Sequence, residues 1–137
     1  MKKNKLFSIA GICLSALIGG ILIFAYAAGQ RPFKDLEPEE VVSASVRLLP
    51  PDKTVQITEL EKLLDYLDAV VIYNKDDSYT EYAGQAVTVT VTLADGTQTD
   101  IMAYNPFLVI DGVGYRTKYG PCEALSAYAN GLMKDRL

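Results

Sequence analysis

The strongest nucleophile in this chain is a cysteine at the start of a predicted helix. Cys122 follows Gly120-Pro121, a pair that ends a strand and begins a helix. The first turn of a helix lowers the pKa of a thiol, which favours thiolate chemistry. The chain contains no histidine to act as its base, however, and Cys122 is in helical step with Leu125 and Leu132. We therefore favour a buried core cysteine and expect no catalytic residue, with a thiol-dependent enzyme as the alternative.

Oxygen-bearing side chains gather in a second stretch, from Asn74 to Glu81. Asn74, Asp76, Ser78 and Thr80 have the alternating spacing of a calcium loop, but Tyr79 occupies the place of its sharp-turn glycine and no helix directly precedes it. The neighbouring carboxylates of Asp76 and Asp77 do not converge on one substrate atom, so they are a poor acid and base pair. We interpret this stretch as a solvated turn and expect neither a metal nor a cofactor.

Tyrosines are the third group of candidates, because nine occur in a chain without tryptophan. A tyrosine ring offers a flat apolar surface and a hydroxyl, which suits a glycan, a peptide or a protein partner. Tyrosine is also a preferred strand residue, so packing within a sheet is the competing explanation. The candidate binding residues are Tyr73, Tyr79, Tyr82, Tyr104, Tyr115 and Tyr119.

The stretch Ala86–Tyr119, which contains half of these tyrosines, has the pattern of an antiparallel sheet. Apolar and hydroxyl-bearing residues alternate from Val87 to Leu93, which gives one apolar face and one polar face. Asp95-Gly96 and Asp111-Gly112 lie where the alternation stops, and glycine supplies the positive φ of a tight hairpin. The pattern predicts a four-strand meander.

The first turn of the meander also predicts a register. A three-residue loop, Ala94-Asp95-Gly96, places Val89 opposite Ile101 and Thr90 opposite Asp100. A two-residue loop would put polar groups on the buried face, and a slip of one residue would expose the whole row of valines. We therefore expect the three-residue loop.

The remaining elements flank the meander. We expect a strand or hairpin at Ser43–Leu49 and Val55–Ile57, and a strand at Val70–Tyr73. A capping box of Thr58 and Glu61 predicts a helix with Leu60, Leu63, Leu64 and Leu67 on one face. A second helix is expected from Cys122 to about Lys134, with Cys122, Leu125, Ala129 and Leu132 on one face. The predicted fold class is α+β, with one antiparallel sheet and two helices packed on one face.

The N-terminal part of the chain is predicted to lie in the membrane. Leu6–Ala28 is a run of 23 uncharged residues after the lysines of residues 1–5, which indicates an N-terminus in the cytoplasm and an extracytoplasmic domain. A cleaved signal is the alternative, because Ala25-Tyr26-Ala27 is a small-x-small site, but the run exceeds the usual length of such a signal's apolar region. Gly11, Ser15 and Gly19 share one helical face, which makes a homodimer a further hypothesis.

Domain boundaries and charge follow from this division. We expect residues 1–29 to be the anchor or signal, 30–40 a juxtamembrane tether and 41–137 the α+β domain. Residues 35–137 carry eight basic and 17 acidic side chains, a net charge of −9. Nucleic acid is excluded as a partner, because phosphate binding needs a basic surface.

Three segments resemble a known domain: Asn105–Ala129, Tyr79–Gln85 and Pro32–Leu36. They are similar to a small extracytoplasmic domain of unknown function in Gram-positive anaerobes, found in membrane-anchored proteins and behind the membrane part of zinc-peptidase sensors like the BlaR/MecR receptors. The similarity spans about residues 32–134 and implies a sensing or interaction role, without identifying a functional residue. The chain lacks the His-Glu-x-x-His and Ser-x-x-Lys motifs of those receptors, so their peptidase and acylation chemistry is not expected.

These observations predict an anchored extracytoplasmic module that binds a cell-wall ligand or another envelope protein without catalysis. The alternatives are a thiol-dependent enzyme that uses Cys122 and an inhibitor secreted after cleavage near Ala27.

Overall fold

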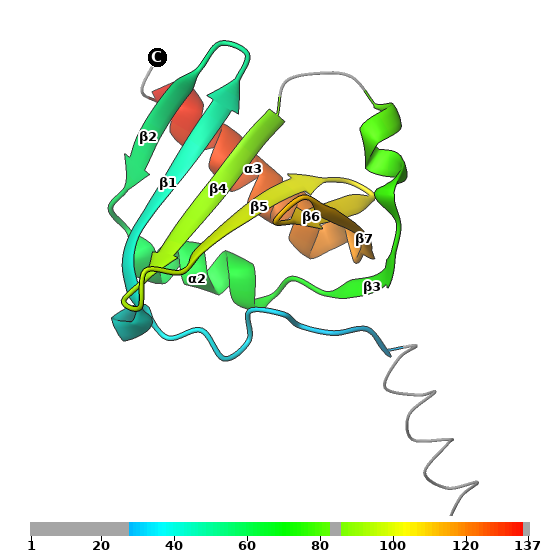
Figure 1. The fold of residues 1–137 in the computed structure, drawn as a ribbon, viewed down its shortest axis with the longest axis horizontal. Helices are drawn as coiled ribbons and strands as arrows, with labels where there is room; N and C mark the ends of the chain where they lie inside the picture. Colours follow the sequence, from blue (N-terminus) through cyan, green and yellow to red (C-terminus); the bar gives the residue numbers. More distant parts are fainter. Residues whose placement is uncertain (1–27, 83–85, 136–137) are drawn as a thin grey trace, which may run out of the picture. The chain divides into compact units, whose positions relative to one another are not determined.

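The computed structural model describes residues 28–82 and 86–135. The predicted α+β class is confirmed, since two helices accompany a single antiparallel sheet of seven strands in these residues (Figure 1). In chain order the elements are η1 (Pro38–Glu40), β1 (Val41–Leu49), β2 (Lys53–Ile57), α2 (Leu60–Asp68), β3 (Ile72–Lys75), η2 (Asp77–Glu81), β4 (Ala86–Leu93), β5 (Gln98–Tyr104), β6 (Phe107–Ile110), β7 (Val113–Thr117) and α3 (Tyr119–Asp135), where η denotes a 3-10 helix.

The sheet has the strand order β2-β1-β4-β5-β6-β7-β3. Strands β4 to β7 form the predicted meander, and β1 and β2 form the predicted N-terminal hairpin. The strand expected at Val70–Tyr73 begins two residues later, at Ile72, because the Val70 N–H is still bonded to the carbonyl of Leu67, at 3.2 Å, in the turn that follows α2. This strand, β3, pairs with β7 and completes the edge opposite β2.

The register predicted for the first hairpin of the meander is confirmed. Val89 faces Ile101 and Thr90 faces Asp100. Leu93 N–H donates to the carbonyl of Thr97 at 2.8 Å, which closes a three-residue loop. Gly96 adopts a φ of +88°, which a side chain would disfavour.

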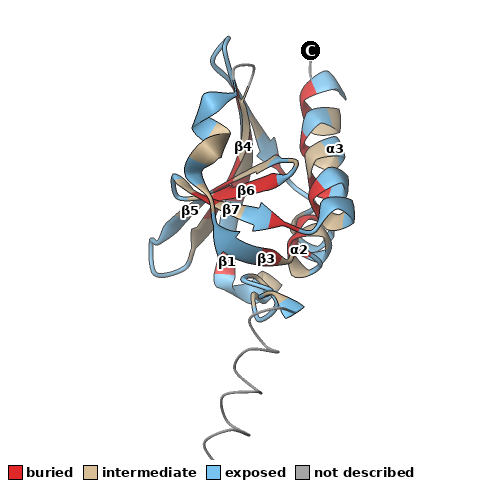
Figure 2. Cartoon of the chain, turned by 90° about the vertical axis from the view of Figure 1, so that its right-hand side faces the viewer, coloured by how far each residue is buried: buried red, intermediate tan, exposed pale blue. Residues whose placement is uncertain are grey.

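Both helices lie on the same side of the sheet and bury the apolar side chains of its inner face (Figure 2). Leu63, Leu64 and Leu67 of α2 are buried, and α3 buries a row at its inner face. Each fully buried aliphatic side chain contributes about 1.5–3 kcal/mol, so this layer is the main source of stability. The buried row of α3 is Cys122, Leu125, Ala129 and Met133.

Three details of the helices differ from the prediction. The capping box of Thr58 and Glu61 does not form, because Glu59 occupies the N-cap of α2 without a side-chain capping bond. Helix α3 begins three residues early, at Tyr119, since Pro121 in the first turn sacrifices no intrahelical hydrogen bond. Met133 is buried in place of Leu132, which stays partly exposed.

The segment predicted to be a tether is part of the folded unit, which begins at Arg31 rather than at residue 41. Arg31 forms an ion pair of 2.7 Å with Asp68, and Phe33 and Leu36 pack against the core. The predicted helical turn at Pro38 is present as η1.

In the part of the chain that is described, no helix is long and apolar enough to span a membrane. Residues 6–27 of the predicted anchor, including Gly11, Ser15 and Gly19, and the cleavage site near Ala27 lie outside the described residues.

Candidate functional site

The face of the sheet that carries no α-helix is polar over β1, β4 and β5, and we call it the outer face. Thr90 Oγ1 donates to Asp100 Oδ1 at 2.6 Å across β4 and β5. Ser45 is paired with Thr90 in register, so one row of short polar side chains crosses three strands. Exposed apolar side chains on β1 lie near its two ends, at Val42 and Leu49.

The outer face becomes apolar at β6, where Phe107 and Val109 are buried, and η2 lies against the neighbouring Gly114 of β7. Asp76 N–H donates to the carbonyl of Gly114 at 2.9 Å, and Gly114 N–H donates to Asp77 Oδ1 at 2.8 Å. The hydroxyl of Tyr79 donates to the carbonyl of Gly112 at 2.8 Å. These three bonds fasten the turn at residues 76–82 to β7 and its hairpin.

Asp76 has two further partners. Ser78 donates to Asp76 Oδ1 through its hydroxyl at 2.5 Å and its N–H at 3.0 Å, and Arg116 Nε donates to Asp76 Oδ2 at 2.8 Å. The Ser78 bonds first, and then Arg116, lower the pKa of the Asp76 carboxyl to about 2. Both carboxylate oxygens are thus engaged in holding η2 in place. No group of three metal-ligating side chains occurs within residues 28–82 and 86–135.

Beside η2 lies a cluster that we call the aromatic patch: Tyr82, Tyr104, Phe107 and Arg116. Phe107 is almost fully buried, with the Tyr82 ring centroid 5.8 Å away and the Arg116 guanidinium 5.0 Å from its ring. Tyr82 and Tyr104 lie 6.0 Å apart and remain 57% and 40% exposed. The patch therefore presents two tyrosines and a cation to solvent on a buried phenylalanine.

The six candidate tyrosines do not form one shared surface. Only Tyr82 and Tyr104 are in ring contact with each other, and Tyr79, a residue of η2, lies against Gly114 of β7. Tyr115 packs against the core on the inner face, because its cross-strand neighbour is the buried Leu108. The other two, Tyr73 on β3 and Tyr119 at the start of α3, are exposed.

Sequence reasoning missed two members of the patch, Phe107 and Arg116. The signal was the second turn of the meander, Asp111-Gly112, whose two residues have φ values of 49° and 82°. A two-residue turn at this pair puts Phe107 opposite Arg116. The register of the hairpin would therefore have identified both residues.

Cys122 is confirmed as a core cysteine. Its side chain is fully buried, and its Sγ donates to the carbonyl of Phe107 at 3.5 Å. Burial, with a smaller contribution from Glu123, raises the pKa of the thiol to about 12. The expectation that the helix start would lower this pKa is wrong, because desolvation of the thiolate outweighs the helix dipole here.

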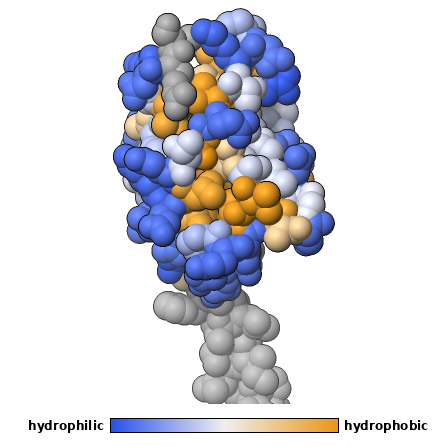
Figure 3. Space-filling model, turned by 90° about the vertical axis from the view of Figure 1, so that its left-hand side faces the viewer, coloured by the Kyte–Doolittle hydropathy of each residue, from blue (hydrophilic) through white to orange (hydrophobic). Residues whose placement is uncertain are grey.

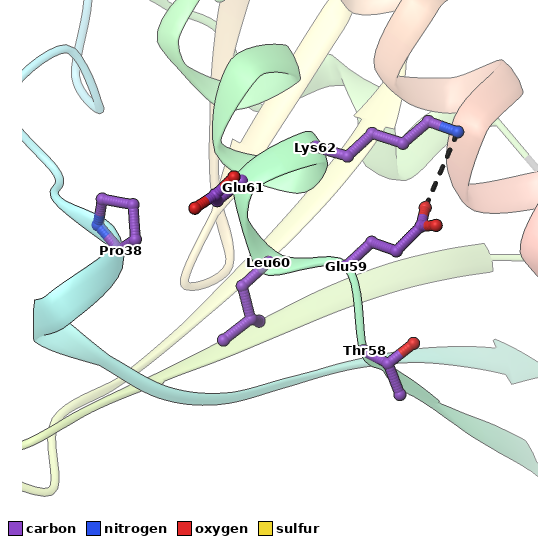
Figure 4. A pocket seen from close by; sticks show the side chains of 6 residues that line it. All are labelled: Pro38, Thr58, Glu59, Leu60, Glu61 and Lys62. Carbon is purple, nitrogen blue, oxygen red and sulfur yellow. Dashed lines mark ion pairs between the residues drawn. The ribbon is translucent and has the colours of Figure 1, made fainter.

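Apart from the aromatic patch, the surface has an open groove of about 650 Å³ between η1 and the start of α2 (Figure 4). The Glu61 carboxylate points toward Pro38, whereas Glu59 and Lys62 extend to the other side and pair at 3.7 Å. Since these charged groups diverge, they do not act together on one substrate atom.

An apolar band is visible on the side of the molecule where β2 forms the edge of the sheet, bordered by hydrophilic residues (Figure 3). The partly exposed apolar residues of β2, α2 and α3 include Val55, Leu60 and Leu132. Nothing in the structure indicates what covers this band.

The fold and these surfaces define a class: an α+β protein with helices on one face of an antiparallel sheet and an aromatic patch on the other. No family model matches the chain, and no curated protein or solved structure is significantly similar to it.

Proposed function

We propose that this protein is a membrane-anchored, extracytoplasmic module that binds a cell-wall ligand or another envelope protein without catalysis. The observation that carries the proposal is the aromatic patch, where Tyr82 and Tyr104 are exposed above the buried Phe107. Exposed tyrosines held by a rigid base are typical of binding hot spots, because they contribute a large contact area at a small entropic cost.

The bonds that fix η2 support this proposal. Tyr82 directly follows η2, and its N–H donates to the carbonyl of Tyr79 at 3.2 Å. Since Tyr79 is itself bonded to Gly112, the backbone of Tyr82 is positioned before any ligand arrives. Such preorganisation reduces the entropy that is lost on binding.

The surroundings of Cys122 argue against thiol chemistry. Its buried sulfur faces a backbone carbonyl, and the chain has no histidine. Burial also raises the pKa of the thiol to about 12, which leaves it protonated at neutral pH. A binding role needs none of these groups to react.

The test is a crosslinked pull-down from native envelopes with the full-length protein. We expect the wild type to recover a specific partner, and Tyr82→Ala/Tyr104→Ala to recover at least several-fold less, since such anchors often contribute 2 kcal/mol or more, roughly thirty-fold in affinity. Tyr119→Ala is the matched control, because Tyr119 is 66% exposed at the start of α3. Recovery that does not exceed an anchor-only control, or that survives the double substitution, would contradict the proposal.

A further inference from the structure

A different cavity, independent of the aromatic patch, lies where the N-terminal segment of the folded unit crosses the sheet. It has a volume of about 330 Å³, at the small end of the range for ligand sites. The N-terminal segment forms one wall and strands β4 and β5 form the other. The lining residues are Pro32, Phe33, Asp35, Leu36 and Glu40 of the N-terminal segment, and Val91, Leu93, Thr99 and Ile101 of the two strands. We call it the N-segment groove.

The base of the groove is apolar and firmly held. Val91 is 2% and Ile101 1% exposed, so the sheet side belongs to the core itself. Phe33 and Leu36, on the wall formed by the N-terminal segment, pack against this core and are only half buried. An apolar side chain that enters the groove would therefore cover Phe33, Leu36 and Leu93, and the free energy of this burial would favour binding.

The polar groups of the lining are acidic. Asp35 and Glu40 are the only charged residues among those that line the groove. Neither carboxylate has an ion-pair partner within residues 28–82 and 86–135. Glu40 Oε2 accepts only a long bond of 3.4 Å, from the N–H of Glu37, so most of its hydrogen-bonding capacity is free.

The wider charge of the folded unit reinforces this local one. Residues 31–137 contain ten basic and 17 acidic side chains, a net charge of −7. This net charge attracts cations to the folded unit as a whole and repels anions. An anionic or purely apolar ligand would leave both carboxylates without a partner.

We propose that the N-segment groove binds a cationic peptide segment, with an apolar side chain in the groove and flanking lysine or arginine side chains on Asp35 and Glu40. The apolar base gives the affinity and the two carboxylates select the charge. The occupant is thus a peptide in which a bulky apolar residue stands between basic ones. This binding requires neither Tyr82 nor Tyr104.

The probe for the test is the peptide acetyl-Lys-Leu-Lys-Phe-Lys-amide, with acetyl-Glu-Leu-Glu-Phe-Glu-amide as its charge-reversed counterpart. The full-length protein in phosphatidylcholine nanodiscs is titrated with each peptide by calorimetry and by NMR, since a zwitterionic lipid surface does not attract either one. We expect the lysine peptide to bind, with NMR shifts centred on the groove, and the glutamate peptide to show no binding at the same concentrations.

The variant Asp35→Asn/Glu40→Gln keeps the size of both side chains and removes their charge. We expect it to weaken binding of the lysine peptide by about two- to thirty-fold, the range for two exposed charge pairs. Glu39→Gln is the matched control, because Glu39 belongs to the same 3-10 helix but does not line the groove. It should change the affinity by less than about twofold.

Three results would overturn the inference: equal binding of the two peptides, wild-type affinity of Asp35→Asn/Glu40→Gln for the lysine peptide, or NMR shifts that centre away from the groove. The variant Tyr82→Ala/Tyr104→Ala separates this inference from the proposed function. It should leave binding of the lysine peptide unchanged, so either site can fail without the other.

Discussion

Gly114 is the position where a single methyl group should detach η2 from the sheet. A Cβ built on Gly114 would clash with the backbone carbonyl oxygen of Asp76 and would lie 2.6 Å and 2.9 Å from Cδ1 and Cε1 of Tyr79. The carbonyl belongs to the backbone, and the tyrosine ring is held by its bond to Gly112, so neither neighbour yields easily. The segment at residues 76–82 has to move as a whole.

The magnitude follows from what that movement breaks. Three hydrogen bonds fasten the turn to β7 and its hairpin: one from Asp76 N–H to Gly114, one from Gly114 N–H to Asp77 Oδ1 and one from the Tyr79 hydroxyl to Gly112. Each contributes about 1 kcal/mol net, so moving the turn costs about 3 kcal/mol. Keeping the bonds instead would cost about 1–3 kcal/mol of overpacking strain. The protein takes the cheaper of the two, and we therefore expect Gly114→Ala to lower the free energy of unfolding by about 2–3 kcal/mol.

The assay is urea unfolding of the full-length protein followed by circular dichroism, together with limited proteolysis around η2. We expect a lower midpoint for Gly114→Ala and faster cleavage within residues 76–82. Gly131→Ala is the matched control, because nothing lies within 4 Å of its Cβ and it is inside helix α3. That control should be neutral or more stable by up to about 1 kcal/mol, as expected for alanine in a helix.

The reasoning would be refuted by a Gly114→Ala protein with wild-type stability and wild-type cleavage of η2. It would also fail if Gly131→Ala lost as much stability as Gly114→Ala, because the effect would then reflect glycine replacement in general and not the close approach of η2.

Further predictions concern acid stability, the core and the membrane. The pKa of Asp76 is lowered on folding, so its stabilising effect is complete above its ordinary pKa and is lost as the pH falls toward about 2; Asp76→Asn should be less stable at neutral pH and less sensitive to acid in this window, which unfolding curves from pH 2 to 7 will reveal. Phe107→Ala should lower the free energy of unfolding by about 3–5 kcal/mol, measured in urea, because it empties a buried site that supports Tyr82. Cys122, which is fully buried, should react with a thiol reagent only after denaturation, and rapid labelling at Cys122 in the native protein would contradict its place in the core; peptide mapping separates it from Cys13, the second thiol of the chain. Intact mass from native membranes should be that of the full-length chain, whereas a mass starting near Ala28 in the medium would favour the secreted inhibitor.

Local chemistry was sufficient to predict the meander. Alternation along β4 specified which face is apolar, and the turn at Asp95-Gly96 specified how β5 pairs with it. The sequence did not predict the start of α2 correctly: Thr58 is the better N-cap by residue type, but the helix begins at Leu60 with Glu59 at the N-cap and no side-chain capping bond. The N-terminal segment was predicted to be a tether because it has two prolines and several charged residues. Its only large apolar side chains, Phe33 and Leu36, are too few to give a periodic pattern, although both pack against the core.

The sequence by itself determined the fold class, the register of the first hairpin and the identity of Cys122 as a core residue, since each depends on residues that are close together along the chain. Only the tertiary structure decided which aromatic residues meet. Tyr82 and Tyr104 come together because η2 is bonded to Gly114, 37 residues away from Asp77. Contacts between residues so far apart in the sequence depend on how the strands and η2 are arranged in the whole fold. The apolar period within one segment carries no information about these contacts.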